Sequence, residues 1–215
     1  MKVISKTVNK NETSIELDLF EGRDLKPALK KKIADEVGQF IVEQTLVAMN
    51  EQRSPVRGEG SFKPLSPEYK KRKKLEVGNT TPNLEFDGIL KDELDYEITE
   101  SGVAIGVFGE RAPAADGHNN LSGKSKLPTR RFLPDEGQEY KANIKKEVER
   151  IVADVIAEET AFSKKDFEGI ETKAQLYNKL KSIFGDLPRG ELQLAVYRNE
   201  DLTVIFKKLN LTDLL

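Results

Sequence analysis

The sequence has no cysteine and no tryptophan, and His118 is its one histidine. The lack of cysteine excludes a disulfide scaffold, a thiolate metal site and a cysteine nucleophile. A Ser-His-Asp triad could form only through His118. Neither sign of charge is in clear excess: 35 Lys and Arg and 37 Asp and Glu give a net charge of −2, which argues against a dedicated nucleic-acid binder.

Long apolar runs are also absent. No run approaches the roughly 18 residues that a membrane span requires, and Met1 to Lys10 contain no apolar segment typical of a signal peptide. We therefore expect a soluble protein, without a membrane partner, that is made in a reducing cytoplasm. The apolar fraction of 37% allows a modest core, and 215 residues fit one domain or one domain with an appendage.

Hydrophobic periodicity predicts the main regular elements, because strands alternate with period two and helices repeat every three or four residues. The residues alone therefore predict the α+β class. The elements are a half-buried strand over 13–20, a long helix from an Asp24 N-cap to about Gln52, an antiparallel hairpin of strands 94–98 and 103–107, and a second long helix over about 135–160.

Residues 53–82 and 109–131 are rich in turn-forming residues and lack this periodicity, so we predict long loops there. Within the first, a short helix is expected to begin at Ser66-Pro67, because proline suits the first helical position. Another short helix, interrupted by Gly88, is predicted between Asn83 and Asp92. Loops of this length are usually functional or ordered only by a partner.

The residues after 160 look separable, so we divide the chain into a domain at 1–160 and a C-terminal extension at 161–215. A capping box that begins at Thr172 predicts a helix that ends at Gly185. After Pro188 the pattern fits either a β-hairpin or a helix, and the hairpin is favoured because turn residues and β-branched residues agree with it. The extension is thus predicted to be an α/β appendage.

An acidic group suggests one enzyme hypothesis, a metal-dependent nuclease that holds a magnesium ion. Such a site needs carboxylates that converge from rigid elements, whereas these lie close together in sequence around a glycine. A solvated acidic surface is the favoured interpretation, and we predict no metal, no cofactor and no catalytic residue. The group consists of Glu85, Asp87, Asp92, Glu93 and Asp95.

Two further features have functional interpretations. The run from Lys70 to Lys74 is compatible with binding to DNA phosphates, which gives the hypothesis of a nucleic-acid-binding adaptor, although a solvated helix face is favoured. His118 lies near Asp116 and two asparagines, and we expect it to be an exposed loop residue. Walker-type and Rossmann glycine patterns are absent.

Five segments between Phe62 and Leu133 occur in a defined order. They are Phe62-Lys63-Pro64-Leu65-Ser66-Pro67-Glu68-Tyr69-Lys70, Leu84-Glu85-Phe86-Asp87-Gly88-Ile89-Leu90, Val103-Ala104-Ile105-Gly106, Ala114-Ala115-Asp116-Gly117-His118-Asn119, and Leu127-Pro128-Thr129-Arg130-Arg131-Phe132-Leu133. Taken in this order, they make residues 24–160 resemble the virion-morphogenesis proteins of tailed bacteriophages, also called tail-completion or neck proteins.

The resemblance implies a fold in which two long helices pack on one face of a small antiparallel sheet. It also implies a structural protein, not an enzyme, that forms a homo-oligomeric ring (hexamer or dodecamer) at the head–tail junction. Its neighbours would be a connector, adaptor or head-closure protein on one side and a tail terminator or tail tube protein on the other. Such a protein assembles in the host cytoplasm and resides in the virion, with DNA only as passing cargo.

The long polar loops fit this role, because the loops of a ring subunit can order against neighbouring subunits on assembly. The resemblance therefore points to structural or interface positions and not to a catalytic site. These positions are Pro64, Leu65, Lys70, Lys73, His118, Arg130, Phe132 and Leu133.

Overall fold

The computed structural model describes residues 2–20, 25–84, 88–159 and 175. The chain divides into two units, residues 1–21 with 31–152 and residues 22–30 with 153–215. The predicted helix and hairpin of the C-terminal extension lie outside the described residues. The sheet and the candidate site belong to the first unit.

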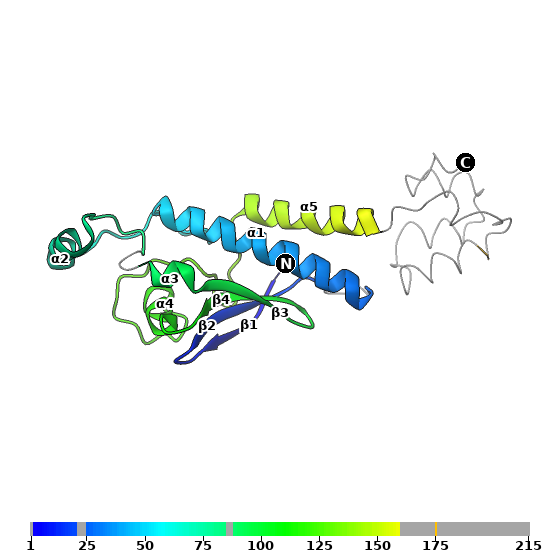
Figure 1. Cartoon of the computed structure of the whole chain (residues 1–215), viewed down its shortest axis with the longest axis horizontal. Coiled ribbons are helices and arrows are strands. Elements are labelled where there is room, and N and C mark those ends of the chain that lie inside the picture. The colour runs from blue at the N-terminus through cyan, green and yellow to red at the C-terminus, as the bar shows by residue number, and fades with distance from the viewer. Residues whose placement is uncertain (1, 21–24, 85–87, 160–174, 176–215) are drawn as a thin grey trace. The chain divides into compact units, whose positions relative to one another are not determined.

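A four-stranded antiparallel sheet with the strand order β1-β2-β4-β3 organises the first unit (Figure 1). The strands are β1 (Lys2–Val8), β2 (Glu12–Asp18), β3 (Leu94–Ile98) and β4 (Gly102–Phe108). β1 and β2 form one hairpin, β3 and β4 form the other, and the two hairpins join where β2 pairs with β4. The predicted hairpin and the predicted strand near residues 13–20 are confirmed, although β2 ends at Asp18.

Residues that pair across strands share a face of the sheet, so the register defines two faces. One of them, the covered face, has mainly apolar rows in which Ile15, Ile105 and Val107 are fully buried. Its cross-strand rows are Val3-Leu17-Val103-Ile98, Lys6-Ile15-Ile105-Tyr96 and Val8-Thr13-Val107-Leu94.

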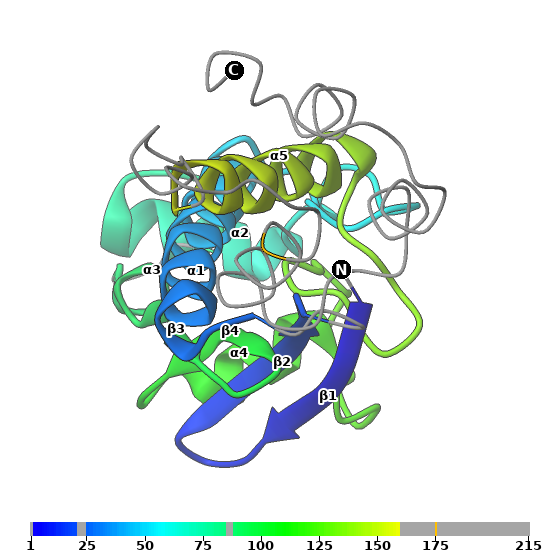
Figure 2. The same ribbon diagram turned by 90° about the vertical axis from the view of Figure 1, so that its right-hand side faces the viewer.

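Two long helices, α1 (Pro27–Asn50) and α5 (Ala142–Glu159), lie on the same side of this sheet. α1 is next to the sheet and α5 lies beyond it (Figures 1 and 2). Tyr96 fixes α1 to the sheet, because its Oη donates a hydrogen bond to Asp35 Oδ1 at 2.7 Å. Gly38 permits this close approach, since a Cβ there would lie 2.3 Å from the Tyr96 ring. The predicted α+β class, a small antiparallel sheet with helices, is confirmed.

Three short helices complete the described fold of this unit: α2 (Pro67–Val77), α3 (Ile89–Asp92) and α4 (Ala112–Asn119). Ser66 caps α2 by accepting a hydrogen bond from the Tyr69 N–H, and Gly78 ends it with a φ of 73°, which confirms the helix predicted at Ser66-Pro67. α3 follows Gly88, and α4 packs against β1, β2 and β4. None of the helices in the described residues is long and apolar enough to cross a membrane.

The structure adds one strand that the sequence did not predict and corrects two expectations about the elements. The first ten residues contain the strand β1, which periodicity does not indicate. Residues 109–131 are not one loop, because α4 occupies Ala112–Asn119. α5 begins at Ala142 and not near residue 135, because the chain turns at Gly137, with a φ of 76°, and then bridges Tyr140 to Val56.

Candidate functional site

Arg130 joins two segments that are far apart in the sequence. The residue is only 5% exposed, and its guanidinium donates hydrogen bonds from Nε to the Lys63 carbonyl at 2.8 Å and from Nη2 to the Pro64 carbonyl at 3.0 Å. Hydrogen bonds to a charged group contribute about 1.5–3 kcal/mol each. Arg130 therefore fastens the Pro-Leu-Ser-Pro segment to the segment that precedes α5.

Asn119, the last residue of α4, fixes the two residues after Arg131. Its Oδ1 accepts hydrogen bonds from the N–H groups of Phe132 and Leu133 at 2.8 and 2.7 Å, and its Nδ2 donates to the Ala115 carbonyl at 2.9 Å. All three residues, Asn119, Phe132 and Leu133, are fully buried. Phe132 and Leu133 are thus core residues of this unit, which fits the structural and not the interface alternative expected for them.

His118 lies in α4 and is mostly buried, which corrects the expectation of an exposed loop residue. Its carbonyl accepts a hydrogen bond from the Arg130 N–H at 2.9 Å. Burial, and to a lesser extent the charge of Arg130, lowers the pKa of the imidazole to about 4, so the side chain is neutral at pH 7. Its Nδ1 has no hydrogen-bond partner among the described residues, whereas a catalytic triad needs an orienting partner there.

These segments surround a cavity of about 370 Å³. Helix α2 contributes Tyr69, Arg72 and Lys73, and the opposite wall contains Arg111, Ala114, His118 and Arg130. The cavity residues that the structure describes include no carboxylate. Within the described ranges, no three His, Cys, Asp or Glu residues are grouped so that they could hold a metal ion. The described lining therefore has neither a pair of carboxylates nor a grouped set of metal ligands.

Lys73 is buried, which corrects the expectation that it lies on an interface. Only 2% of the residue is exposed, and its Nζ donates hydrogen bonds to the Thr81 carbonyl at 2.7 Å and to Asn83 Oδ1 at 2.9 Å. Arg72, in the same basic run, forms an ion pair with Glu76 at 2.9 Å. The charge that this run can offer to DNA is therefore smaller than its sequence suggests.

The acidic group is dispersed in its described part. The Glu93 carboxylate accepts hydrogen bonds from the N–H groups of Glu110 and Arg111 at 3.1 and 2.8 Å, so it stabilises the start of α4. Asp92 and Asp95 are exposed. Glu85 and Asp87 lie outside the described residues.

Of the other expected interface positions, Pro64 and Lys70 are exposed and Leu65 is half-buried. Leu65 contributes to the wall of the cavity. These three residues are therefore accessible on the described surface, unlike Lys73, Phe132 and Leu133.

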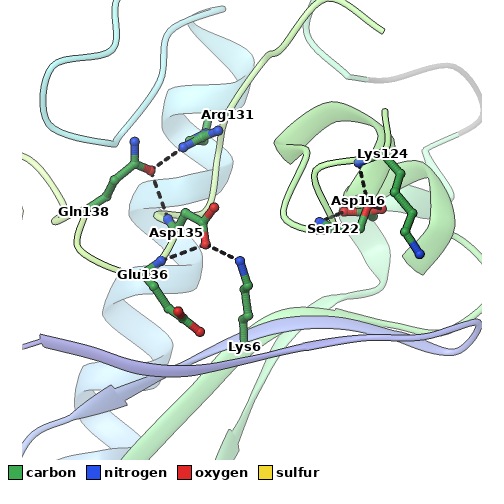
Figure 3. Close-up of polar contacts among 8 residues, drawn as sticks. All are labelled: Lys6, Asp116, Ser122, Lys124, Arg131, Asp135, Glu136 and Gln138. Atoms are coloured by element: carbon green, nitrogen blue, oxygen red, sulfur yellow. Dashed lines mark hydrogen bonds and ion pairs between the residues drawn. The ribbon is translucent and has the colours of Figure 1, made fainter. Parts of the chain in front are cut away.

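The loops that follow α4 and precede α5 are fixed by local carboxylates (Figure 3). The Asp116 carboxylate accepts hydrogen bonds from the Ser122 N–H at 2.8 Å and from its Oγ at 2.6 Å. Asp135 accepts from Lys6 Nζ at 2.8 Å, and this hydrogen bond and charge raise the pKa of Lys6. The loop before α5 is thereby attached to β1.

The half-buried strand predicted near residues 13–20 implied a polar side, but sequence reasoning assigned no function to the face to which it belongs, here called the open face. The long helices lie on the opposite side of the sheet (Figures 1 and 2). The sequence signal for the open face is the alternation of carboxylates with apolar residues in β2 and β3. Hydrogen bonds from Ser101, and then from Thr99 and Ser5, lower the pKa of Glu16, so this carboxylate is ionised. The charged residues of the open face are Lys2, Glu12, Glu16, Asp18, Asp95 and Glu97.

Comparison with known proteins assigns no activity to the chain. No family model matches it, and no solved structure matches it. The uncharacterized protein MJ0331 of Methanocaldococcus jannaschii is 32% identical over 125 residues, which cover 57% of this chain and 90% of the archaeal protein.

Proposed function

The chain belongs to the same family as the uncharacterized archaeal protein MJ0331. On the separate ground of its motifs and their contacts, we propose that the chain is a structural virion protein of a tailed phage. In this role it forms a ring at the head–tail junction, joins the portal-adaptor side to the tail, and performs no enzymatic reaction. It assembles in the host cytoplasm and then resides in the virion.

The observation that supports this proposal most strongly is the contact among the segments that carry the resemblance. Arg130, from the Pro-Thr-Arg-Arg-Phe-Leu segment, binds the carbonyls of Lys63 and Pro64, and its N–H binds the carbonyl of His118. Asn119 then holds Phe132. The roles that these contacts indicate are positional, since in each of them one segment fixes another.

The open face also fits a ring through which DNA passes. It has five carboxylates and one lysine: Glu12, Glu16, Asp18, Asp95 and Glu97 against Lys2. Phosphate binding by proteins depends on Lys and Arg that replace counterions. An acidic surface repels the backbone and so lets DNA move past without being held.

The two alternatives have less support. A nucleic-acid-binding adaptor would use the basic run on α2, but Lys73 is buried and Arg72 is paired with Glu76. A metal-dependent nuclease would use the acidic group, but Glu93 caps the start of α4. Loss of a divalent-metal-dependent activity in Asp87→Ala would favour the nuclease over the structural role.

The test is electron microscopy of virions that carry a C-terminally tagged copy of the chain, with a gold label against the tag. The proposal predicts label at the head–tail junction and, in the absence of the protein, separate heads and tails. Virions without label, together with normal assembly in the absence of the protein, would contradict the structural role.

A further inference from the structure

We propose that the two edges of the sheet join between copies of the chain: β1 of one copy pairs with β3 of the next, so that the sheet continues from subunit to subunit. The inference deepens the proposed function and rests on it for the closed ring. The strand pairing itself has a separate test.

Strands β1 and β3 occupy opposite edges of the sheet (Figure 2). Among the described residues, these two strands make no hydrogen bond to other backbone groups outside the sheet ladder. The Tyr96 N–H of β3 donates to the neighbouring Asp95 carboxylate at 2.8 Å, a local contact that a partner strand would replace. An edge strand with unpaired N–H and C=O groups is a template for another strand. Both edges of this sheet are therefore able to accept one.

The direction of the strands determines which copies can pair. Each neighbouring pair in the order β1-β2-β4-β3 is antiparallel, so β1 and β3 run in opposite directions. A second copy in the same orientation therefore places its β1 antiparallel to β3 of the first. Such a contact joins two different surfaces, and head-to-tail contacts of this kind close into rings when the rotation permits.

Charge favours this pairing over a two-fold one. β1 has Lys2 and Lys6 and no carboxylate, whereas β3 has Asp95 and Glu97 and no cation. Lys6 already pairs with Asp135 on the covered face, but Lys2 is exposed on the open face, as are both carboxylates of β3. Pairing β1 with β1, or β3 with β3, would bring like charges together, which is unfavourable on adjacent strands.

Apolar side chains at the edges of the covered face support the same contact. Val8 on β1 is 36% exposed and Ile98 on β3 is 41% exposed. Each ends an apolar row whose inner members are buried. In the register that continues these rows, Val8 of one copy lies beside Leu94 of the next, and Val3 lies beside Ile98. The apolar rows, and with them the core, then continue across the contact.

The β1 edge also limits pairing with unrelated strands. The register shifts between Val3 and Ser5, so a bulge interrupts the strand and leaves Ser5–Val8 as its regular part. Bulges and lysines are common means of preventing uncontrolled edge association. A partner must therefore match the short regular part, and β3, with five residues, is of similar length.

Cysteine cross-linking tests the pairing of β1 with β3. Because the natural chain has no cysteine, every disulfide must come from the introduced residues. The variants are T7C/D95C, T7C/E97C, S5C/D95C and S5C/E97C, which cover neighbouring registers on the open face. Within one copy, β1 and β3 are separated by three strand spacings, roughly 14 Å, which is too far for a disulfide. Any disulfide between the two strands must therefore join two copies.

Under mild oxidation of the purified full chain, at least one double variant is expected to give a ladder of multimers that ends at the size of the ring. The corresponding single variants should give none, and a mixture of the two single variants should give dimers only. Glu97→Lys should weaken association roughly threefold per contact, the effect of one cross-strand charge pair, and K2E/E97K should restore part of it.

Dimers from a single variant would overturn the proposal in favour of two-fold pairing. No cross-link in any of the four double variants, at concentrations where the chain is oligomeric, would overturn the strand pairing and leave the ring intact. A chain that is monomeric at all concentrations and absent from virions would contradict the ring as well, so the two failures are distinguishable.

Discussion

The two faces of the sheet are built by the same four strands and have opposite chemistry. On the covered face, Ile15 and Ile105 are fully buried beneath the helices. On the open face, Glu16 and Glu97 are charged; Glu16 is half-buried and Glu97 is exposed. The difference shows that one face supplies the core of the unit, while the other contributes little to it.

The largest expected effect separates the two faces directly. Ile105→Ala removes a fully buried side chain from the central row of the covered face, so we expect the free energy of unfolding to fall by about 3 kcal/mol. Urea unfolding followed by circular dichroism measures this change. A loss below about 1 kcal/mol would mean that the covered face is not the core of the unit.

Asn119→Ala tests the buried junction beside the sheet. The substitution leaves the N–H groups of Phe132 and Leu133 without their acceptor in the core, at an expected cost of about 2–3 kcal/mol in the free energy of unfolding. Asn50→Ala is the matched control, because Asn50 is exposed and accepts one hydrogen bond from Lys91. Equal effects of the two substitutions would refute the structural role of Asn119.

His118→Gln tests the burial of the imidazole through pH. The pKa is about 4 in the folded state and about 6.5 in the unfolded chain, so the unfolded state binds more protons between these values. The contribution of the neutral imidazole to the free energy of unfolding is therefore fully present above pH 6.5. It decreases as the pH drops to 4, by about 3 kcal/mol in total.

The measurement compares urea midpoints of the wild type and His118→Gln from pH 7 to pH 4. Carboxylates titrate in both proteins, so the difference between the two curves isolates the histidine. The wild type should lose stability faster than the variant as the pH falls. Parallel curves would show that the imidazole is solvated in the folded state.

The smallest expected effect is on the open face. Glu97→Gln changes an exposed side chain in an edge strand, so the free energy of unfolding should change by less than about 0.5 kcal/mol. Thermal unfolding under conditions that keep the chain monomeric measures it. A loss as large as that of Ile105→Ala would remove the distinction between the faces.

The sequence was sufficient to predict those elements whose periodicity is undisturbed. β2 and β3 alternate apolar with polar or charged residues, and β4 alternates Val103, Ile105 and Val107 with small residues. α1 repeats its apolar residues at helical steps. The strand β1 was not predicted, because its bulge between Val3 and Ser5 breaks the period of two. As a result, Lys2 and Lys6 lie on different faces of the sheet. The β-branched Val3, Ile4, Thr7 and Val8 were the remaining signal.

The site was harder to predict because it depends on tertiary contacts. α4 has only eight residues, and Gly117 within it is a poor helix former. Its signals were Pro113 in the first turn and the left-handed Asn120 that ends it. The burial of Lys73 and Arg130 could not be inferred, because three of their acceptors are the carbonyls of Thr81, Lys63 and Pro64. Sequence patterns do not reveal backbone acceptors.

Electron microscopy of the purified full chain over a range of concentrations tests the central claim most directly. The claim is that the covered face stabilises a subunit whose edge strands serve assembly, while the open face lets DNA pass. It predicts closed rings of one size, in which the density of the sheet is continuous from subunit to subunit. Compact monomers at every concentration, or rings whose subunits meet only through helices, would contradict it.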